Sequence, residues 1–294
     1  MGGVARGRHH RCRCAHAVII DAHRHYWDPA RLDYAWLAGA PPSLKRAFLP
    51  ADLVGGDDAC MLVQAAPSED ETRFLFELAR ATPGTLGVVG WVDMQAANVH
   101  DRIDQLIAEG GGLLRGIRPM IQDIPDSGWL LSPALDHAFD HLRDRALVFD
   151  ALIDGRHLRP LLERLGKHPG LRTVIDHAAK PDIDAGNFAE WASAIARLAQ
   201  MPDVYCKFSG LATETTRGAD VTALDPYATH LFDVFGSSRL IWGSDWPVVT
   251  TAATYGAWKA CALELVRRHA PGAEAAVFGG NALDIYSLDV RTSP

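Results

Sequence analysis

Two histidines separated by one residue, His23 and His25, end an apolar run near the start of the chain. Alternate side chains of a strand point to the same face, so both imidazoles project together if this run is a strand. Paired imidazoles can bind a divalent metal ion or hydrogen-bond jointly to a substrate oxygen. Far along the chain, a second apolar run leads in the same way to a carboxylate, Asp245. The two runs together predict one polar site that holds a metal ion or a substrate oxygen.

Eight short apolar runs are the elements that must position these side chains. Each run is rich in Val, Ile, Leu or Phe and apolar on both faces, as buried parallel strands are. The runs cover residues 18–21, 60–65, 86–92, 113–118, 147–153, 173–177, 204–208 and 240–243. Between them, apolar residues recur at helical spacing, for example in residues 99–107, 158–165, 188–198 and 231–235.

Strict alternation of strands and helices predicts an α/β fold, and specifically a single-domain (β/α)₈ TIM barrel over residues 17–294. A doubly wound sheet is disfavoured, because no glycine-rich phosphate-binding motif follows the first strand. Two helix starts are predicted where an N-cap residue precedes proline, at Ser132 with Pro133 and at Asp225 with Pro226. Residues 1–16 are rich in arginine and contain no acidic residue, so we expect them to form a disordered basic extension.

The composition excludes several classes of protein. Hydrophobic residues make up 48% of the chain and charged residues 22%, which is typical of a soluble globular enzyme. A formal net charge of −7 gives no reason to expect nucleic acid as a partner. No apolar run approaches the about 20 residues that span a bilayer, so we expect no membrane association. Five scattered cysteines favour a reducing, cytoplasmic location, and the expected partner is a small-molecule substrate.

Active-site residues of a barrel lie at the carboxyl ends of its strands and in the loops that follow. Reading these positions from the predicted strands gives a polar set: His23, His25, Gln64, Trp91, Asp93, Arg115, Arg118, Asp150, Asp176, His177, Lys207, Ser209 and Asp245. Two tryptophans, Trp27 and Trp36, lie in the long connection after the first strand, where they can form the wall of a pocket.

The order of these motifs resembles that of a known superfamily. Residues 20–29, IDAHRHYWDP, resemble the opening of the amidohydrolase superfamily, in particular the branch of sugar-lactone and 2-pyrone-4,6-dicarboxylate lactonases. The similarity continues through RGIR at 115–118, VIDHAAKP at 174–181, KFSGL at 207–211, GSDWP at 243–247 and GNA at 280–282. It therefore covers roughly residues 18–288, on successive predicted strands.

The resemblance implies a hydrolase that opens the ring of an aldonolactone with water as the nucleophile. Asp245 is then the general base, which accepts a proton from water and passes it to the leaving oxygen. His23, His25 and His177 stabilise the oxyanion, either as direct hydrogen-bond donors or by holding a metal ion that acts as a Lewis acid.

Substrate contacts are expected from Trp27, Trp36, Arg118 and Lys207. Four of the remaining residues at strand ends are interpreted as structural or packing residues, namely Trp91, Arg115, Asp150 and Asp176.

The metal content is expected to be one divalent ion at most. Binuclear members of the superfamily carry a bridging Lys or Glu after the fourth strand and histidines after the fifth and sixth. Here the fourth predicted strand ends without Lys or Glu, and residues 147–153 contain no histidine. A single ion, with zinc as the first choice, would be held by His23, His25 and Asp245. Metal-independent catalysis stays open as the alternative, because a lactone is an activated ester.

Two other functions stay open. The first is a metal-dependent decarboxylase of an aromatic or unsaturated acid, built on the same histidines and aspartate. Its substrate carboxylate calls for basic residues, and only Arg118, Lys180 and Lys207 are available. The second is a barrel without catalytic activity that binds a carbohydrate or a metal ion. The presence of the whole set of three histidines and Asp245 argues against that second alternative.

Overall fold

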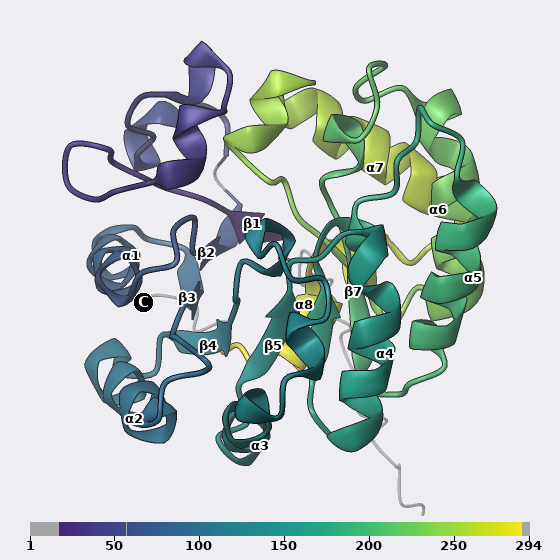
Figure 1. The fold of residues 1–294 in the computed structure, drawn as a ribbon. Coiled ribbons are helices and arrows are strands. Elements are labelled where there is room, and N and C mark those ends of the chain that lie inside the picture. The colour runs from purple at the N-terminus through teal and green to yellow at the C-terminus, as the bar shows by residue number, and fades with distance from the viewer. Residues whose placement is uncertain (1–17, 57, 290–294) are drawn as a thin grey trace, which may run out of the picture.

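Eight parallel strands, hydrogen-bonded in chain order, form the centre of the molecule in the computed structural model, which describes residues 18–56 and 58–289 (Figure 1). The strands are β1 (Ile20–Arg24), β2 (Ala59–Val63), β3 (Thr85–Gly90), β4 (Leu114–Ile117), β5 (Val148–Ala151), β6 (Thr173–Ile175), β7 (Val204–Phe208) and β8 (Leu240–Trp242). Each overlaps one predicted run, and the strand order confirms the predicted (β/α)₈ barrel. The predicted extension, residues 1–16, lies outside the described residues.

The barrel closes where the candidate site residues lie. The backbone N–H of Asp245 donates to the carbonyl of His23 at 2.8 Å, and that of His25 donates to the carbonyl of Trp246 at 2.8 Å. Below this junction, the buried carboxylate of Asp21 accepts bonds from the backbone N–H and the hydroxyl of Ser244, both at 2.7 Å. The hydrogen bonds that join β1 to the segment after β8 therefore also fix the positions of His23, His25 and Asp245.

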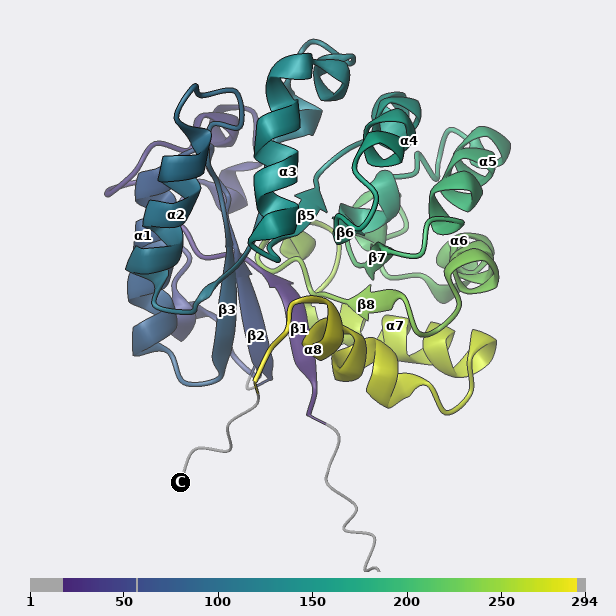
Figure 2. The same ribbon diagram turned by 90° about the horizontal axis from the view of Figure 1, so that it is seen from below.

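Helices surround the strands, and the chain leaves each strand through a loop and returns through a helix (Figure 2). The helices are α1 (Glu69–Ala81), α2 (Val99–Gly110), α3 (Asp136–Asp144), α4 (Leu158–Lys167), α5 (Phe188–Ala199), α6 (Val221–Phe235), α7 (Tyr255–His269) and α8 (Asn281–Ile285). Apolar side chains from β1, β2, β3, β5, β6 and β8 fill the barrel, and α8 packs on them from the amino ends of the strands. Within the described ranges, no helix combines the length and the hydropathy needed to cross a bilayer.

The two predicted helix starts have different outcomes. Ser132 and Pro133 do precede a helical segment, a 3-10 turn that leads into α3, although the Ser132 side chain makes no capping bond. The start predicted at Asp225 is wrong, because α6 begins at Val221 and Asp220 caps it. Asp225 instead binds His269 and Arg268 of α7, at 3.0 and 2.9 Å.

Candidate active site

A cavity of about 160 Å³ opens at the carboxyl ends of the strands. The predicted residues that line it are His25, Trp27, Trp36, Arg118, His177 and Asp245. His23 is fully buried beside them, with its ring centroid 4.7 Å from that of His25 and 4.5 Å from that of His177. The other lining residues are Ala65, Met120, Gln122, Leu152, Lys180 and Val248.

Three imidazoles surround the carboxylate of Asp245. Its Oδ1 atom lies 3.3 Å from Nε2 of His25, 3.7 Å from Nε2 of His23 and 3.8 Å from Nε2 of His177. The Nε2 atoms of His23 and His25 are 3.0 Å apart. The structure thus brings together the four residues that the sequence assigns to catalysis.

Contacts on the far side of two rings set how the rings face the cavity. Nδ1 of His25 lies 2.7 Å from the carbonyl of Val63. Since a carbonyl only accepts, Nδ1 carries a proton, and in the neutral ring the Nε2 atom of His25 then presents a lone pair. Nδ1 of His177 lies 2.9 Å from the hydroxyl of Ser209, which leaves its Nε2 toward Asp245.

The backbone adopts rare conformations where it carries two of these side chains. Residues 177–180 have four consecutive φ angles of 49–58°, although none of them is glycine. Asp245 has a φ of 57°. A non-glycine residue in this region costs about 1–2 kcal/mol, and such strain concentrates at functional sites. No sequence signal indicated this left-handed turn.

Two glycines allow the histidines to sit this close to neighbouring strands. A Cβ atom added to Gly210 would lie 2.6 Å from the ring of His177, and Gly210 also has a φ of 69°. A Cβ atom added to Gly243 would lie 2.6 Å from the Cβ atom of His23. Any side chain at either position would displace a site histidine, which explains why both motifs contain glycine.

Burial and mutual proximity set the charges of the site. Burial lowers the pKa of His177 to about 4, against the opposing effect of Asp245 and Asp176. Burial, reinforced by the positive charge of Lys207, also holds the pKa of His23 well below its ordinary value. Burial on its own raises the pKa of Asp245, but the adjacent His177 and His25 outweigh it and hold that pKa below its ordinary value. At neutral pH the site therefore combines an ionised carboxylate with neutral His23 and His177.

A buried chain of charges lies beneath the site. Oδ1 of Asp176 is 3.5 Å from Nδ1 of His23 and 3.0 Å from the ammonium of Lys207. That ammonium is 2.6 Å from Asp150, whose carboxylate accepts a 2.8 Å bond from the hydroxyl of Tyr286. The interpretation of Asp150 and Asp176 as structural residues agrees with this arrangement, since neither lines the cavity.

Lys207 is predicted to contact the substrate, but the structure places it away from the cavity. Its side chain is fully buried inside the barrel, does not line the cavity, and ends between Asp150 and Asp176. A lysine that reaches inward from β7 meets these carboxylates of β5 and of the segment after β6 before it can reach the cavity. Arg118 does line the cavity, and it also binds Asp176 at 3.2 Å.

Several contributing residues carried no clear sequence signal. Glu71 of α1 is fully buried and accepts a 2.8 Å bond from the backbone N–H of Ala65, at the end of β2. Burial raises the pKa of Glu71 to about 8. The indole N–H of Trp36 donates to the carbonyl of Ala65 at 2.8 Å. Lys180 was detectable, because it belongs to the motif at 174–181, whereas Tyr286 lies in no motif.

Two groups of donors in the described part of the chain are close enough to share a metal ion. One is the predicted set of His23, His25 and Asp245, and the other is His23, Asp176 and His177. Donor atoms about 2.0–2.2 Å from a tetrahedral ion lie roughly 3.4 Å from each other. The predicted set fits, because its three separations are 3.0, 3.3 and 3.7 Å.

Comparisons with known proteins agree on one family. The family model described as amidohydrolase matches residues 20–288. An L-fucono-1,5-lactonase of Burkholderia ambifaria is 42% identical over 279 residues, which cover 92% of this chain and 96% of the relative. An L-fucono-1,5-lactonase of Burkholderia multivorans is 33% identical and covers 92% and 97%, respectively. The crystal structure of an amidohydrolase from Burkholderia multivorans with bound zinc superimposes with a TM-score of 0.84, at 32% identity, over 93% of this chain and 100% of that one.

Proposed function

The chain belongs to the amidohydrolase family, and we propose that it is a lactonase that opens the ring of a sugar lactone of the L-fucono-1,5-lactone class. The observation that carries the proposal is the carboxylate of Asp245, which faces three imidazoles at the base of a cavity of about 160 Å³. Relatives named for this activity cover nearly the whole chain.

Asp245 is the general base in this proposal. Its low pKa keeps it ionised, so it accepts a proton from the attacking water as the water oxygen bonds to the lactone carbonyl carbon. When the tetrahedral intermediate collapses, the bond from carbon to the ring oxygen breaks. Asp245 returns its proton to that oxygen, and the product is the open hydroxy acid. No group other than water is consumed.

The carbonyl oxygen becomes negative during the attack and must be stabilised. In its neutral form, His25 cannot donate a hydrogen bond to it from Nε2, because the single ring proton sits on Nδ1 and binds the carbonyl of Val63. A lone pair there suits a metal ion better than an oxyanion. We therefore favour one divalent ion, with zinc as first choice, held by His23, His25 and Asp245. When bound, such an ion would polarise the carbonyl and lower the pKa of bound water. His177, outside this set, faces Asp245 and can orient the substrate.

The purified protein is expected to bind one divalent ion per chain. His25→Ala removes one of the three protein donors and should weaken zinc affinity by at least about 10–100-fold, the usual cost of losing even an outer-shell partner of a metal ligand. Elemental analysis and calorimetric zinc titration measure this, with the exposed His100→Ala as the matched control. Two tightly bound ions per chain, or full activity after exhaustive chelation, would contradict the single-ion site without contradicting lactone hydrolysis.

The proposed activity is tested on a panel of 1,4- and 1,5-aldonolactones that includes L-fucono-1,5-lactone. Ring opening releases one proton per lactone, which a pH-stat records against the uncatalysed rate. Release of carbon dioxide from aromatic or unsaturated acids would instead indicate the decarboxylase. Saturable sugar or metal binding without any turnover would indicate the non-catalytic barrel.

A further inference from the structure

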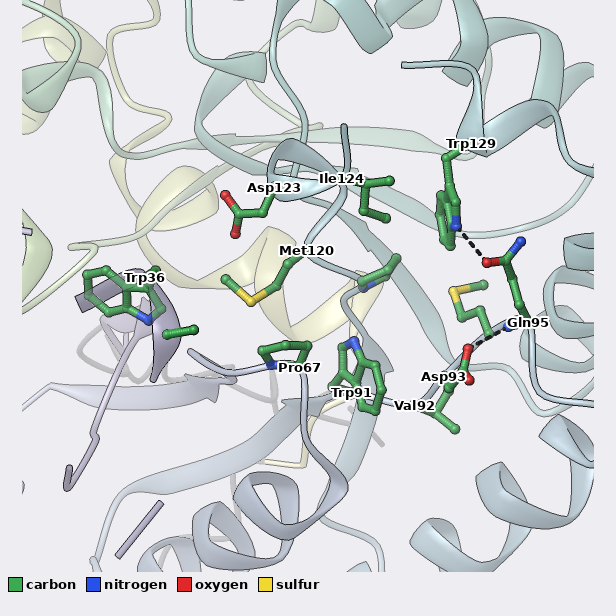
Figure 3. A pocket seen from close by; sticks show the side chains of 13 residues that line it. Trp36, Pro67, Trp91, Val92, Asp93, Gln95, Met120, Asp123, Ile124 and Trp129 are labelled. Atoms are coloured by element: carbon green, nitrogen blue, oxygen red, sulfur yellow. Dashed lines mark hydrogen bonds between the residues drawn. The ribbon is translucent and has the colours of Figure 1, made fainter. Parts of the chain in front are cut away.

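A second, larger cavity adjoins the candidate active site (Figure 3). It has a volume of about 570 Å³ and shares two lining residues, Trp36 and Met120, with the smaller cavity. In Figure 3, Trp36 lies at one end of it, Trp129 and Gln95 lie at the other, and Met120 lies between. The two cavities therefore adjoin each other at Trp36 and Met120, and the proposed chemistry uses only the smaller one.

We propose that the larger cavity binds an uncharged glycosyl group attached to the lactone, so that the enzyme also hydrolyses the lactones of disaccharide aldonic acids. This inference rests on the proposed function. It adds a second binding site for the sugar that is not opened.

Size is the first support for this assignment. Pockets for drug-sized ligands typically occupy about 300–1,000 Å³. The active-site cavity, at about 160 Å³, lies below this range and fits one small ring. The adjoining cavity, at about 570 Å³, lies within the range and is far larger than a methyl or hydroxymethyl substituent requires. A second sugar ring, attached to the lactone, has a size that suits this cavity.

The lining of the larger cavity matches the two faces of a sugar. Trp36, Trp91 and Trp129 offer broad apolar surfaces, which suit the C–H face of a pyranose ring. Two of these rings are fixed by their own hydrogen bonds: the indole N–H of Trp36 binds the carbonyl of Ala65 at 2.8 Å, and that of Trp129 binds Oε1 of Gln95 at 3.1 Å. Ring orientation is thus set before the ligand arrives.

Polar groups around the aromatic surfaces can accept the hydroxyl hydrogens of a sugar. Asp93 and Asp123 line the cavity together with Gln95. The lining contains no lysine, arginine or histidine, so a phosphate or a carboxylate on the substituent would meet only like charge. A purely apolar substituent would displace water from both carboxylates without replacing its hydrogen bonds. An uncharged group that bears hydroxyls avoids the like charge and also replaces the hydrogen bonds of the displaced water.

The test compares glucono-1,5-lactone with the 1,5-lactones made by oxidising laminaribiose, cellobiose, lactose and gentiobiose, which carry a sugar at O3, O4 or O6. We expect kcat/KM for at least one disaccharide lactone to exceed that of gluconolactone by about tenfold, which corresponds to about 1.4 kcal/mol of added binding. In Trp129→Ala this gain should disappear, while kcat/KM for gluconolactone stays unchanged. Leu131→Ala is the matched control, because Leu131 shares a 3-10 turn with Trp129 but does not line the cavity.

The outcomes separate the two proposals. If no lactone is opened at all, the proposed function fails. If gluconolactone or L-fucono-1,5-lactone is opened but no disaccharide lactone exceeds its parent, the glycosyl site is refuted and the lactonase stands. A disaccharide preference that Trp129→Ala leaves intact would also refute the assignment of this cavity. Circular dichroism of Trp129→Ala and Leu131→Ala establishes that both variants fold.

Discussion

Replacing Asp245 with asparagine is expected to lower kcat for lactone opening by about 10²–10⁴-fold, the usual cost of losing a general base. Asparagine keeps the shape of the side chain but cannot accept the proton of water. The KM value should change little, because the lost interaction belongs to the transition state. Initial rates of ring opening in a pH-stat, at saturating L-fucono-1,5-lactone, measure the effect. Metal content is measured on the same sample, so that loss of the base is distinguished from loss of the ion.

The pH dependence provides an independent check on the same residue. Because the pKa of Asp245 lies below its ordinary value, the base stays ionised through the neutral range. The acid limb of the wild-type profile should therefore lie at about pH 4 or below, where His177, with its pKa of about 4, also gains a proton. Activity is lost as pH falls through this limb and is fully present above it. The exposed Asp33→Asn is the matched control and should show the wild-type profile.

A folded Asp245→Asn protein that opens its best lactone at the wild-type rate would remove Asp245 from the mechanism. An acid limb centred near neutral pH in the wild type would point to a different base. The imidazole nearest to the same carboxylate oxygen is that of His25, whose Nε2 atom lies 3.3 Å from it.

The fold was predictable because parallel barrel strands are buried on both faces and appear as continuous apolar runs. All eight runs became strands, and the polar residues at their carboxyl ends identified His23, His25, His177 and Asp245. The start of α6 was not predictable, because an aspartate followed by proline resembles an N-cap wherever it occurs. Here Asp220 caps the helix one turn earlier, and Asp225 binds α7 instead.

The parts of the site that the sequence did not predict depend on tertiary contacts. In a strand that is buried on both faces, no alternation of polar and apolar residues shows which side chains point into the barrel. Lys207 is such a case, since its position at a strand end fits a substrate contact as well as an internal ion pair. The cavity between Trp36 and Trp129 is formed by loops, and loop conformation is set by packing rather than by local sequence pattern.

Replacing Lys207 with methionine is expected to destabilise the protein by about 3–5 kcal/mol, the usual cost of removing one partner from a buried ion pair. Methionine retains most of the apolar stem of lysine, so the loss of stability measures the effect of removing the charge. Asp150 and Asp176 are both fully buried, and the ammonium of Lys207 lies between them at 2.6 and 3.0 Å. Without it, Asp150 keeps only the hydroxyl of Tyr286 among its side-chain partners in the described part of the chain. Urea denaturation at neutral pH measures the difference in the free energy of unfolding.

The dependence of this loss on pH distinguishes a charge effect from a packing effect. Burial already raises the pKa of Asp150 to about 6 against the opposing influence of Lys207, so removing Lys207 raises it further. A carboxyl whose folded pKa lies above its unfolded pKa loses stability as pH rises through the interval between them. The deficit of Lys207→Met should therefore be larger near about pH 8 than near about pH 5. The double variant Lys207→Met with Asp150→Asn removes one unpaired carboxylate and should recover part of the stability at the higher pH. A deficit that is equal at both pH values, with no recovery in the double variant, would show that Lys207 contributes by packing and not by neutralising this pair of carboxylates.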